Sequence, residues 1–179
     1  QTFYGSFVDS SNYDYIFLND ANQMNVNFRA SGSNTAYITT NRKFKDVSAF
    51  YHVVVAVDTT QGTEADRIKI YINGVQETSF ATATYPSVNT NTTFNNGGTV
   101  YVGSVDGSQQ YFDGSLSHFH WVDGTAYPAS TFGESDSVSG IWKPKTAPSV
   151  TYGTNGLFLK FENSGAMGTD SSGETNTFS

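Results

Sequence analysis

Two pairs of acidic residues have the spacing that places both carboxylates on one face of a β-strand. They are Glu64 with Asp66 and Glu134 with Asp136. Glycoside hydrolysis needs two carboxyl groups about 5–10 Å apart, one acting as the acid and the other as nucleophile or base. Turn-forming residues surround the first pair, which does not suit a rigid catalytic strand. These pairs are the strongest hints of an enzyme in the chain, and they are weak ones.

Histidine and cysteine offer little further chemistry. The chain has three histidines and no cysteine, so thiolate nucleophiles, thiolate metal sites and disulfides are excluded. His118 and His120 lie two residues apart on an expected strand, where both side chains can point to one face and hold a metal. We favour the interpretation that both side chains lie on an exposed face of a sheet and hold no metal.

Calcium suits the acidic residues better, because it takes hard oxygen ligands from loops. The candidate ligands lie in or beside expected turns and are Asp106, Asp113 and Asp123. No Asp-x-Asp loop signature marks a site, and acidic turn residues usually accept backbone hydrogen bonds. We expect that no cofactor is required, and calcium remains an alternative.

Sugar binding needs an exposed aromatic ring beside amides or carboxylates, because a pyranose stacks one face and pairs its hydroxyls. Two segments have these residue types. The candidate ligand-binding residues are Asp106, Gln109, Gln110 and Tyr111 in one segment, and Asn12, Tyr13 and Tyr15 in the other. The alternative for each segment is an ordinary polar loop that packs its tyrosine on the sheet.

Short β-strands must position these side chains, since apolar residues recur with a period of two. The expected strands are residues 2–8, 13–18, 24–29, 36–40, 51–58, 67–72, 99–104, 111–122 and 156–161. Polar turns separate them, as in a sandwich or barrel. Helix is limited to one turn near residues 127–132, with Pro128 at its first position, and residues 81–98 are expected to form a polar loop.

The clearest unit is residues 67–75. Isoleucine occupies every second position of its strand, and Asn73-Gly74 then supplies the two positive φ angles of a type I′ hairpin turn. Along residues 52–57, apolar side chains occupy both the odd and the even positions of the expected strand, so both of its faces are apolar. This predicts an interior strand covered on both faces.

Composition and charge exclude several classes of partner. Aromatic residues make up 15% of the chain and charged residues 14%, which favours half-buried strands over helices. The net charge is −7 with nine Lys and Arg residues, so no basic stripe is present and we expect no nucleic-acid partner. No apolar run approaches the ~20 residues of a membrane helix, so membrane insertion is not expected.

Three segments resemble the concanavalin A-like lectin and laminin G-like domains. Residues 49–58 and 66–75 resemble the central hairpin of those domains, in which an aromatic-His pair opens a strand and Tyr-Ile-Asn-Gly ends the next. Residues 112–121 resemble their Phe-Asp-Gly-x-Leu strand. The resemblance implies an all-β fold, an antiparallel two-sheet jelly-roll sandwich. Glucanases of this kind carry Glu-x-Asp-x-x-Glu on one strand, but Lys69 and Ser139 occupy the closing positions here, so we expect no enzyme.

A narrower resemblance covers residues 122–134, 140–145, 152–161 and 167–173. These strings are similar to laminin G-like modules in structural proteins of tailed bacteriophages, such as tail fibres and head-decorating proteins. Such domains usually begin with a further strand. We therefore expect a single sandwich over residues 1–163 that lacks its first strand, or receives it from a neighbouring copy, and a polar C-terminal tail or linker over residues 164–179.

The resemblance implies a non-catalytic structural or attachment module on the virion surface. Its expected partners are other virion proteins or copies of itself, together with host-surface glycans. The alternative is an autonomous carbohydrate-binding module of a secreted bacterial protein. A glycoside hydrolase is the least favoured reading.

Overall fold

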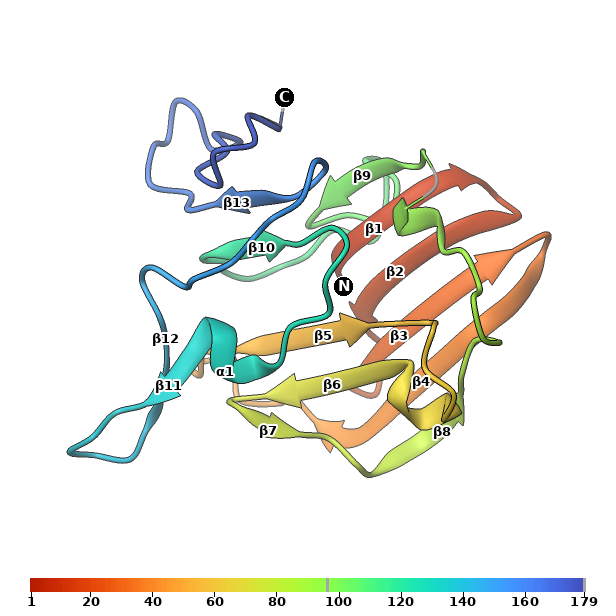
Figure 1. Ribbon diagram of the computed structural model, residues 1–179, viewed down its shortest axis with the longest axis horizontal. Coiled ribbons are helices and arrows are strands. Elements are labelled where there is room, and N and C mark those ends of the chain that lie inside the picture. The colour runs from red at the N-terminus through yellow and green to blue at the C-terminus, as the bar shows by residue number, and fades with distance from the viewer. Residues whose placement is uncertain (96, 179) are drawn as a thin grey trace. The chain divides into compact units, whose positions relative to one another are not determined.

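A computed structural model describes residues 1–95 and 97–178 and contains two compact units, Gln1–Asp113 and Gly114–Ser179 (Figure 1). The strands are β1 (Thr2–Asp9), β2 (Asn12–Leu18), β3 (Gln23–Ala30), β4 (Ser33–Lys43), β5 (Val53–Val57), β6 (Ile68–Ile72), β7 (Val75–Gln76), β8 (Phe80–Thr84), β9 (Thr99–Val102), β10 (Phe119–Trp121), β11 (Gly133–Ser135), β12 (Trp142–Pro144) and β13 (Leu157–Leu159). The helical turns are η1 (Glu64–Asp66), η2 (Thr93–Asn95) and α1 (Ala129–Phe132). The domain boundary predicted at residue 163 stays a prediction, although residues 164–178 belong to the second unit.

The first unit contains a six-stranded antiparallel sheet in the order β8-β4-β3-β2-β1-β9. Its centre is the pairing of β2 with β3, where Asp14 lies opposite Phe28 and Ile16 opposite Val26. Direct partners in a sheet share a face, so one register assigns every side chain of both strands to a side. The first strand, β1, lies inside the sheet between β2 and β9.

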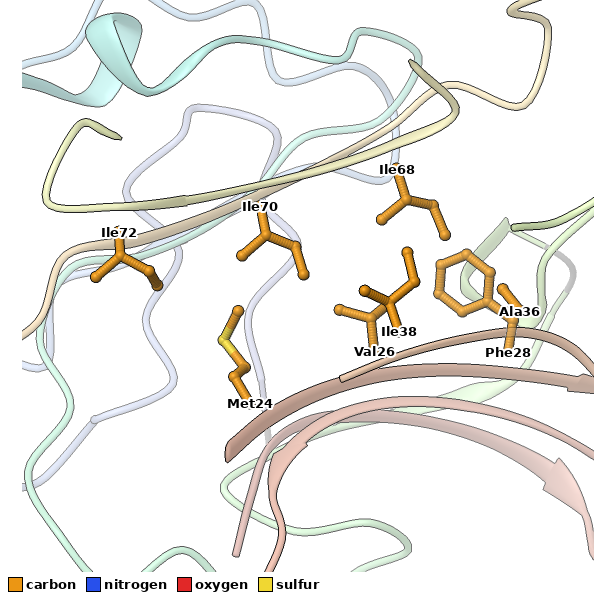
Figure 2. Packing of buried hydrophobic residues seen from close by; sticks show 8 residues of the cluster. All are labelled: Met24, Val26, Phe28, Ala36, Ile38, Ile68, Ile70 and Ile72. Carbon is orange, nitrogen blue, oxygen red and sulfur yellow. The ribbon is translucent and has the colours of Figure 1, made fainter. Parts of the chain in front are cut away.

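A three-stranded sheet, β5-β6-β7, supplies the other layer of this unit. Figure 2 shows the isoleucines of β6 pointing at the inner face of the six-stranded sheet. The buried core cluster consists of Met24, Val26, Phe28, Ala36, Ile38, Ile68, Ile70 and Ile72. Each of these side chains is at most 2% exposed, so the two layers are held by burial of apolar surface. The predicted all-β sandwich is confirmed.

The predicted hairpin is also confirmed. Asn73 and Gly74 have φ angles of 49° and 81°, as a type I′ turn requires. The interpretation of β5 as an interior strand is wrong, because β5 pairs with β6 alone in its sheet and Val53 is 37% exposed. The apolar run of β5 reflects residues such as Val55 and Val57, which pack against the core cluster from the sheet's edge.

Other predicted boundaries need correction. The polar loop expected over residues 81–98 begins with β8, an exposed edge strand that pairs with β4. Alanine and threonine alternate along it, but neither is a large apolar residue, which explains why the pattern did not predict this strand. The long strand expected over residues 111–122 is reduced to β10, because His118 has a φ of 53° that interrupts extended backbone. Pro128 lies directly before α1, not at its first helical position.

A buried carboxylate fixes the long connection after β8. Asp14 on β2 is 1% exposed, and its Oδ2 accepts the backbone N–H of Thr93 at 2.5 Å and of Phe94 at 3.3 Å. Its Oδ1 accepts the N–H of Arg29 at 3.1 Å. Burial raises the pKa of Asp14, and the donors around it oppose that rise. One side chain therefore ties η2 to the centre of the sheet.

Replacing Asp14 should destabilise the first unit. In Asp14→Ala three N–H groups, one in a buried and two in part-buried hydrogen bonds, lose their acceptor, and the free energy of unfolding should fall by about 1–3 kcal/mol. Urea unfolding measures the change. Asp20→Ala, in an exposed turn, is the matched control and should change the unfolding free energy by less than about 0.5 kcal/mol. Equal effects of the two substitutions would contradict the role given to Asp14.

The second unit contains two small antiparallel sheets, β10-β13 and β11-β12. Glycine is required at 133, because a Cβ there would lie 2.5 Å from the ring of Trp142 on the opposite strand. Strands β11 and β12 were not predicted from the sequence, since each has three residues and no alternation. Within the described residues, no helix is long and apolar enough to cross a membrane.

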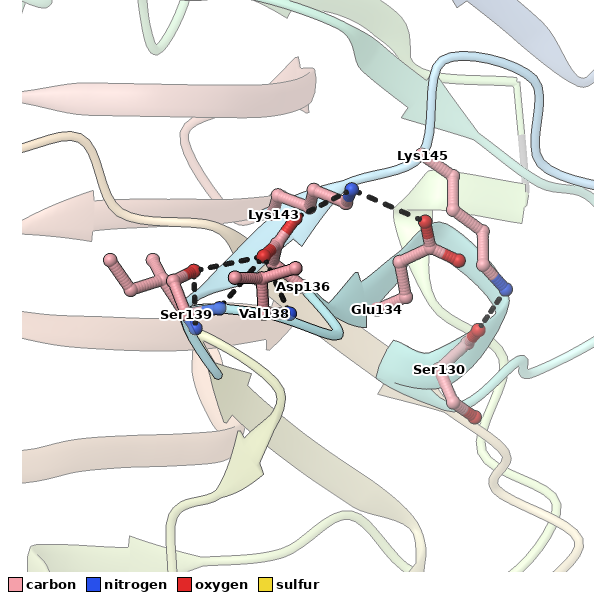
Figure 3. A network of polar contacts seen from close by, with 8 residues as sticks. Ser130, Glu134, Asp136, Val138, Ser139, Lys143 and Lys145 are labelled. Atoms are coloured by element: carbon pink, nitrogen blue, oxygen red, sulfur yellow. Dashed lines mark hydrogen bonds and ion pairs between the residues drawn. The ribbon is translucent and has the colours of Figure 1, made fainter.

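A polar network shapes the turn of the β11–β12 hairpin (Figure 3). Asp136 Oδ1 accepts the backbone N–H groups of Val138 at 3.0 Å and Ser139 at 2.9 Å. Lys143 reaches across the hairpin, with its Nζ 3.2 Å from Asp136 Oδ2 and 3.9 Å from Glu134 Oε1. The backbone donors, followed by Lys143 and the Ser139 hydroxyl, lower the pKa of Asp136 to about 2.

The Asp136 carboxyl should therefore titrate at about pH 2. A folded-state pKa below the unfolded value means that the carboxylate's contribution to hairpin order is complete above about pH 4 and is lost as the pH falls through 2. A carboxyl-carbon NMR titration measures the midpoint. Lys143→Ala should move that midpoint upward. A midpoint near the ordinary aspartate value in the unchanged protein would contradict the network.

The C-terminal segment is tied to β13. Asp170 pairs with Leu159 in a β-bridge, and its Oδ1 accepts the N–H of Phe158 at 2.8 Å. Its Oδ2 accepts the hydroxyl of Ser172 at 2.8 Å and the N–H of Asn176 at 2.9 Å. The segment expected to be a polar tail or linker is thus bonded to β13 at Asp170, its assignment as a tail stays a prediction, and residue 179 lies outside the described residues.

Candidate functional site

The face of the six-stranded sheet that points away from the core carries aromatic and amide side chains. The register of β1 to β4 places on this side Phe7, Tyr13, Tyr15, Phe17, Asn25, Asn27, Arg29, Tyr37 and Thr39. We call this set the outer sheet face. The rings are half-buried, whereas Asn25 and Asn27 are buried although they point away from the core. The amides therefore form a recessed strip along β3.

Four rings of the outer sheet face contact one another in a row, three of them along β2 and one on β1. Tyr13 and Tyr15 are stacked with centroids 5.0 Å apart, and Phe17 meets Tyr15 edge-on at 4.9 Å. Phe7 stacks on Tyr13 at 6.4 Å from the neighbouring strand, and the Arg29 guanidinium lies 5.6 Å from the Tyr13 centroid. Burial, and then the neighbouring Tyr13, raise the pKa of Tyr15. This ordered stack holds the ring positions.

The loop of residues 103–112 lies over this side of the sheet at β1. Gly5 pairs with Tyr15, so a Cβ at Gly5 would point to the same face, where it would lie 2.6 Å from the carbonyl oxygen of Val105. A Cβ at Gly107 would lie 2.9 Å from the ring of Tyr101 on β9. The two glycines let the loop backbone approach the sheet directly beside the aromatic stack.

Hydrogen bonds inside the loop fix its shape. The Asp106 carboxylate accepts the N–H and hydroxyl of Ser108 at 2.9 and 2.8 Å, and the side-chain amide of Gln109 at 2.7 Å. The Gln109 amide, followed by the Ser108 donors, lowers the pKa of Asp106. The loop is also joined to β1, since the Gln110 carbonyl accepts the N–H of Thr2 at 3.0 Å.

Tyr111 is the exposed ring of this loop. Its side chain is 60% exposed, and its hydroxyl donates a hydrogen bond of 2.7 Å to the carbonyl oxygen of Gly107. The ring is thus held in place at its far end while it stays open to solvent. Gln109 and Gln110 beside it are exposed. An immobilised aromatic surface next to amides is the arrangement that stacks a sugar and pairs its hydroxyls.

The two predicted sugar-binding segments therefore lie on the same side of one sheet. Tyr13 and Tyr15 belong to the outer sheet face, and the loop with Asp106, Gln109, Gln110 and Tyr111 lies beside them. Asn12 is different, because its Nδ2 donates to Asp9 at 3.0 Å and its Oδ1 accepts the N–H of Ser31 at 3.0 Å. We assign Asn12 a structural role in the turns.

Sequence reasoning missed the amides of β3 and Tyr37 on β4. Their signal was present, because polar residues alternate with buried apolar ones along residues 24–29. The pattern gives the face of a strand but not which strands lie side by side. Only the register of β2, β3 and β4 places these residues next to Tyr15.

Calcium binding stays a prediction, and two of its three candidate ligands, Asp106 and Asp123, already have hydrogen-bond partners. Calcium takes six to eight oxygen ligands, whereas both oxygens of Asp106 already accept hydrogen bonds within its loop. Asp123 belongs to the other unit and accepts a hydrogen bond of 2.9 Å from Asn155, and Asp113 is exposed. Among residues 1–95 and 97–178, no three acidic, His or Cys side chains converge as a metal site requires.

The histidines His118 and His120 and the acidic pairs identified in the sequence contact residues close to them in the structure. His120 Nδ1 lies 2.8 Å from the Tyr152 hydroxyl, and His118, which is not in a strand, contacts Ser117. Asp66 lies in η1 and pairs with Lys69 at 3.0 Å. Glu134 and Asp136 share Lys143 in the second unit.

The comparisons with known proteins agree with this architecture. Residues 1–130 match the Laminin_G_3 family model, described as the concanavalin A-like lectin/glucanases superfamily. The match covers both sheets of the first unit and the loop that carries Tyr111. No curated protein and no solved structure gave a significant match.

Adding a methyl group at Gly5 should displace the loop. Gly5→Ala puts a Cβ against the carbonyl oxygens of Val105 and Ser104, so overpacking should lower the free energy of unfolding by about 1–3 kcal/mol. The Tyr111 ring should then become more mobile in NMR relaxation. Gly62→Ala is the control, because nothing lies within 4 Å of a Cβ there. Unchanged NMR relaxation of the Tyr111 ring in Gly5→Ala would contradict the close approach of the loop to β1.

Proposed function

We propose a glycan-binding function for this chain, which belongs to the concanavalin A-like lectin/glucanases superfamily. In this proposal the chain is a non-catalytic attachment module. It holds a surface saccharide against Tyr111 and the loop of residues 103–112. The superfamily contains both lectins and glucanases by its description, so the fold alone does not choose between them.

The observation that carries the proposal is the fixed, exposed ring of Tyr111. A free aromatic side chain loses rotamer freedom when it binds, whereas this one is already held by its hydroxyl bond to Gly107. The Asp106–Gln109 pair is likewise ordered before a ligand arrives. Little conformational entropy remains to be lost on binding, which favours a specific site built on a surface loop.

The hydrogen bonds and ion pairs that the acidic pairs make support a non-catalytic module. A retaining or inverting glycosidase needs one carboxyl group kept protonated near neutral pH. Asp66 lies beside Lys69, while the pKa of Asp136 is lowered to about 2 by its N–H donors and Lys143. The surroundings of Asp136 favour its ionised form, which is the opposite of what a general acid requires.

The setting we propose is the surface of a tailed-phage particle, with a secreted bacterial protein as the second setting. This part rests on the resemblance of residues 122–134, 140–145, 152–161 and 167–173 to phage modules. Structural reasons account for several of those residues: Gly133 packs on Trp142, and Asp170 ties the C-terminal segment to β13.

The proposed partners are neighbouring virion proteins or further copies of the chain, and host-surface glycans. Nucleic acid does not suit the net charge of −7.

Removing the Tyr111 ring should weaken glycan binding. On an array of bacterial surface glycans, Tyr111→Ala should lower the affinity for the best-bound glycan by roughly tenfold or more, because the stacking surface is lost. Tyr111→Phe keeps the ring but not its bond to Gly107, and should cause a smaller loss. Tyr71→Ala, on the half-buried outward face of β6, is the control for a tyrosine elsewhere.

Two results would overturn the proposal. The first is an array without any bound glycan. The second is binding that Tyr111→Ala leaves unchanged. Since the Asp106 and Asp123 carboxylates already accept hydrogen bonds from Gln109 and Asn155, we expect the same affinities with and without a chelator. Release of sugar fragments from a bound polysaccharide would show an enzyme instead of a binding module.

A further inference from the structure

Two short loops carry the four most exposed large apolar side chains of the described residues. On the loop of residues 45–50, Val47 is fully exposed and Phe50 is 75% exposed. On the turn of residues 136–141, which joins β11 to β12, Val138 is 95% and Ile141 69% exposed. We propose that the 45–50 loop of one copy of the chain binds the 136–141 turn of a second copy, head to tail. The contact concerns one of the proposed partners, further copies of the chain, and makes no use of the Tyr111 loop.

The 45–50 loop is held in shape from within and at both of its ends. Phe44 and Tyr51 flank it, pack against the core cluster, and meet edge-on with ring centroids 5.0 Å apart. Asp46 Oδ1 accepts the N–H and the hydroxyl of Ser48 at 3.0 and 2.6 Å. All six residues of the loop are nevertheless exposed. The loop therefore presents its two apolar side chains to solvent with little freedom left to lose on binding.

The apolar surface continues from this loop onto the three-stranded sheet. The N–H of His52 donates to Asn73 Oδ1, and the N–H of Asn73 donates to the His52 carbonyl, both at 2.8 Å. These bonds fix the end of the loop beside the turn between β6 and β7. Val53 and Val75 pair with Ile72 from its two sides, and both are exposed at this end of the sheet. A group of neighbouring apolar side chains open to solvent marks an interaction site.

The 136–141 turn is ordered in a similar way (Figure 3). Besides the N–H groups that its side chain accepts, Asp136 donates its own N–H to the Ile141 carbonyl at 2.8 Å. Its carbonyl accepts the N–H of Gly140 at 2.9 Å. The turn thus holds its two apolar side chains on a fixed backbone, and such a hairpin fits an apolar surface on a partner.

The two surfaces carry opposite charge. Lys43 and Lys45 lie beside the 45–50 loop, outnumber its one carboxylate, and make no ion pair within residues 1–95 and 97–178. On the hairpin, Glu134 and Asp136 share Lys143, at 3.9 and 3.2 Å. One lysine serves two carboxylates, so this part of the hairpin keeps negative charge. The free lysines therefore match the hairpin, whereas a contact of either surface with itself would bring like charges together.

The partner that fits is a second copy, because one chain supplies both halves of the contact. Each copy then uses its loop on one neighbour and its hairpin on another. A contact between two different surfaces continues into larger assemblies or closes into a ring.

Sedimentation of the full chain at increasing concentration tests the contact. The unchanged protein should form concentration-dependent oligomers, and added salt should weaken them because it screens the charges. Phe50→Asp and Ile141→Asp should each raise the dissociation constant by roughly tenfold or more. Both side chains are exposed, so the unfolding midpoints should not fall. Val88→Asp and Met167→Asp change exposed apolar residues elsewhere in the same two units. These matched controls should associate as the unchanged protein does.

Mixing the two interface variants separates a head-to-tail contact from a symmetric one. Phe50→Asp keeps an intact 136–141 turn, and Ile141→Asp keeps an intact 45–50 loop. The mixture should therefore form a heterodimer although each variant alone associates poorly. The double variant Lys45→Glu with Glu134→Lys should associate more tightly than either single variant, because the exchange restores opposite charges.

Three results would overturn the proposed contact. They are a protein that stays monomeric at every concentration, self-association that neither interface variant weakens, and a mixture that forms no heterodimer. Each leaves the glycan-binding proposal standing, because the substituted residues lie outside the Tyr111 loop. Conversely, a glycan array without hits does not affect self-association.

Discussion

The register between β2 and β3 is the constraint on which the rest of the first unit depends. It places Asp14 opposite Phe28 and Ile16 opposite Val26, so the apolar partners meet the isoleucines of β6. The same register sends Tyr15 and Asn27 together to the other side. A slip of one residue would exchange the two faces and bury the amides in the core. Core packing and the composition of the outer sheet face are therefore set by one alignment.

The core was predictable from the sequence because its signal is local. Isoleucine at every second position of residues 67–72 gives a buried face, and Asn73-Gly74 gives the turn that follows. The edge strand β8 was not predictable, since its residues are small or polar and exposed. The strand expected over residues 111–122 failed because apolar alternation does not show whether a partner strand is present beside it.

The candidate site was predictable only in parts. Residue types alone identified the Tyr111 loop and the tyrosines of β2, because sugar binding calls for aromatic rings beside amides. Their proximity follows from the absence of a side chain at Gly5, which lets the loop lie against β1. The burial of two single atoms without a hydrogen-bond partner, Asn27 Oδ1 and Arg29 Nε, is a property of three-dimensional packing that the sequence does not show. From the sequence, Asn12 was an equally suitable sugar-binding residue. In the structure its side-chain amide is already hydrogen-bonded to Asp9 and to the N–H of Ser31.

Backbone NMR of the protein titrated with its best-bound soluble polysaccharide tests the central claim most directly, because it maps contacts without any substitution. The account predicts that amide shifts concentrate in residues 103–112 and in the neighbouring strands β1 and β2. The second unit should show no direct contact. Shifts confined to residues 114–178, or no shifts with any polysaccharide, would contradict the assignment of this loop as a glycan-binding site.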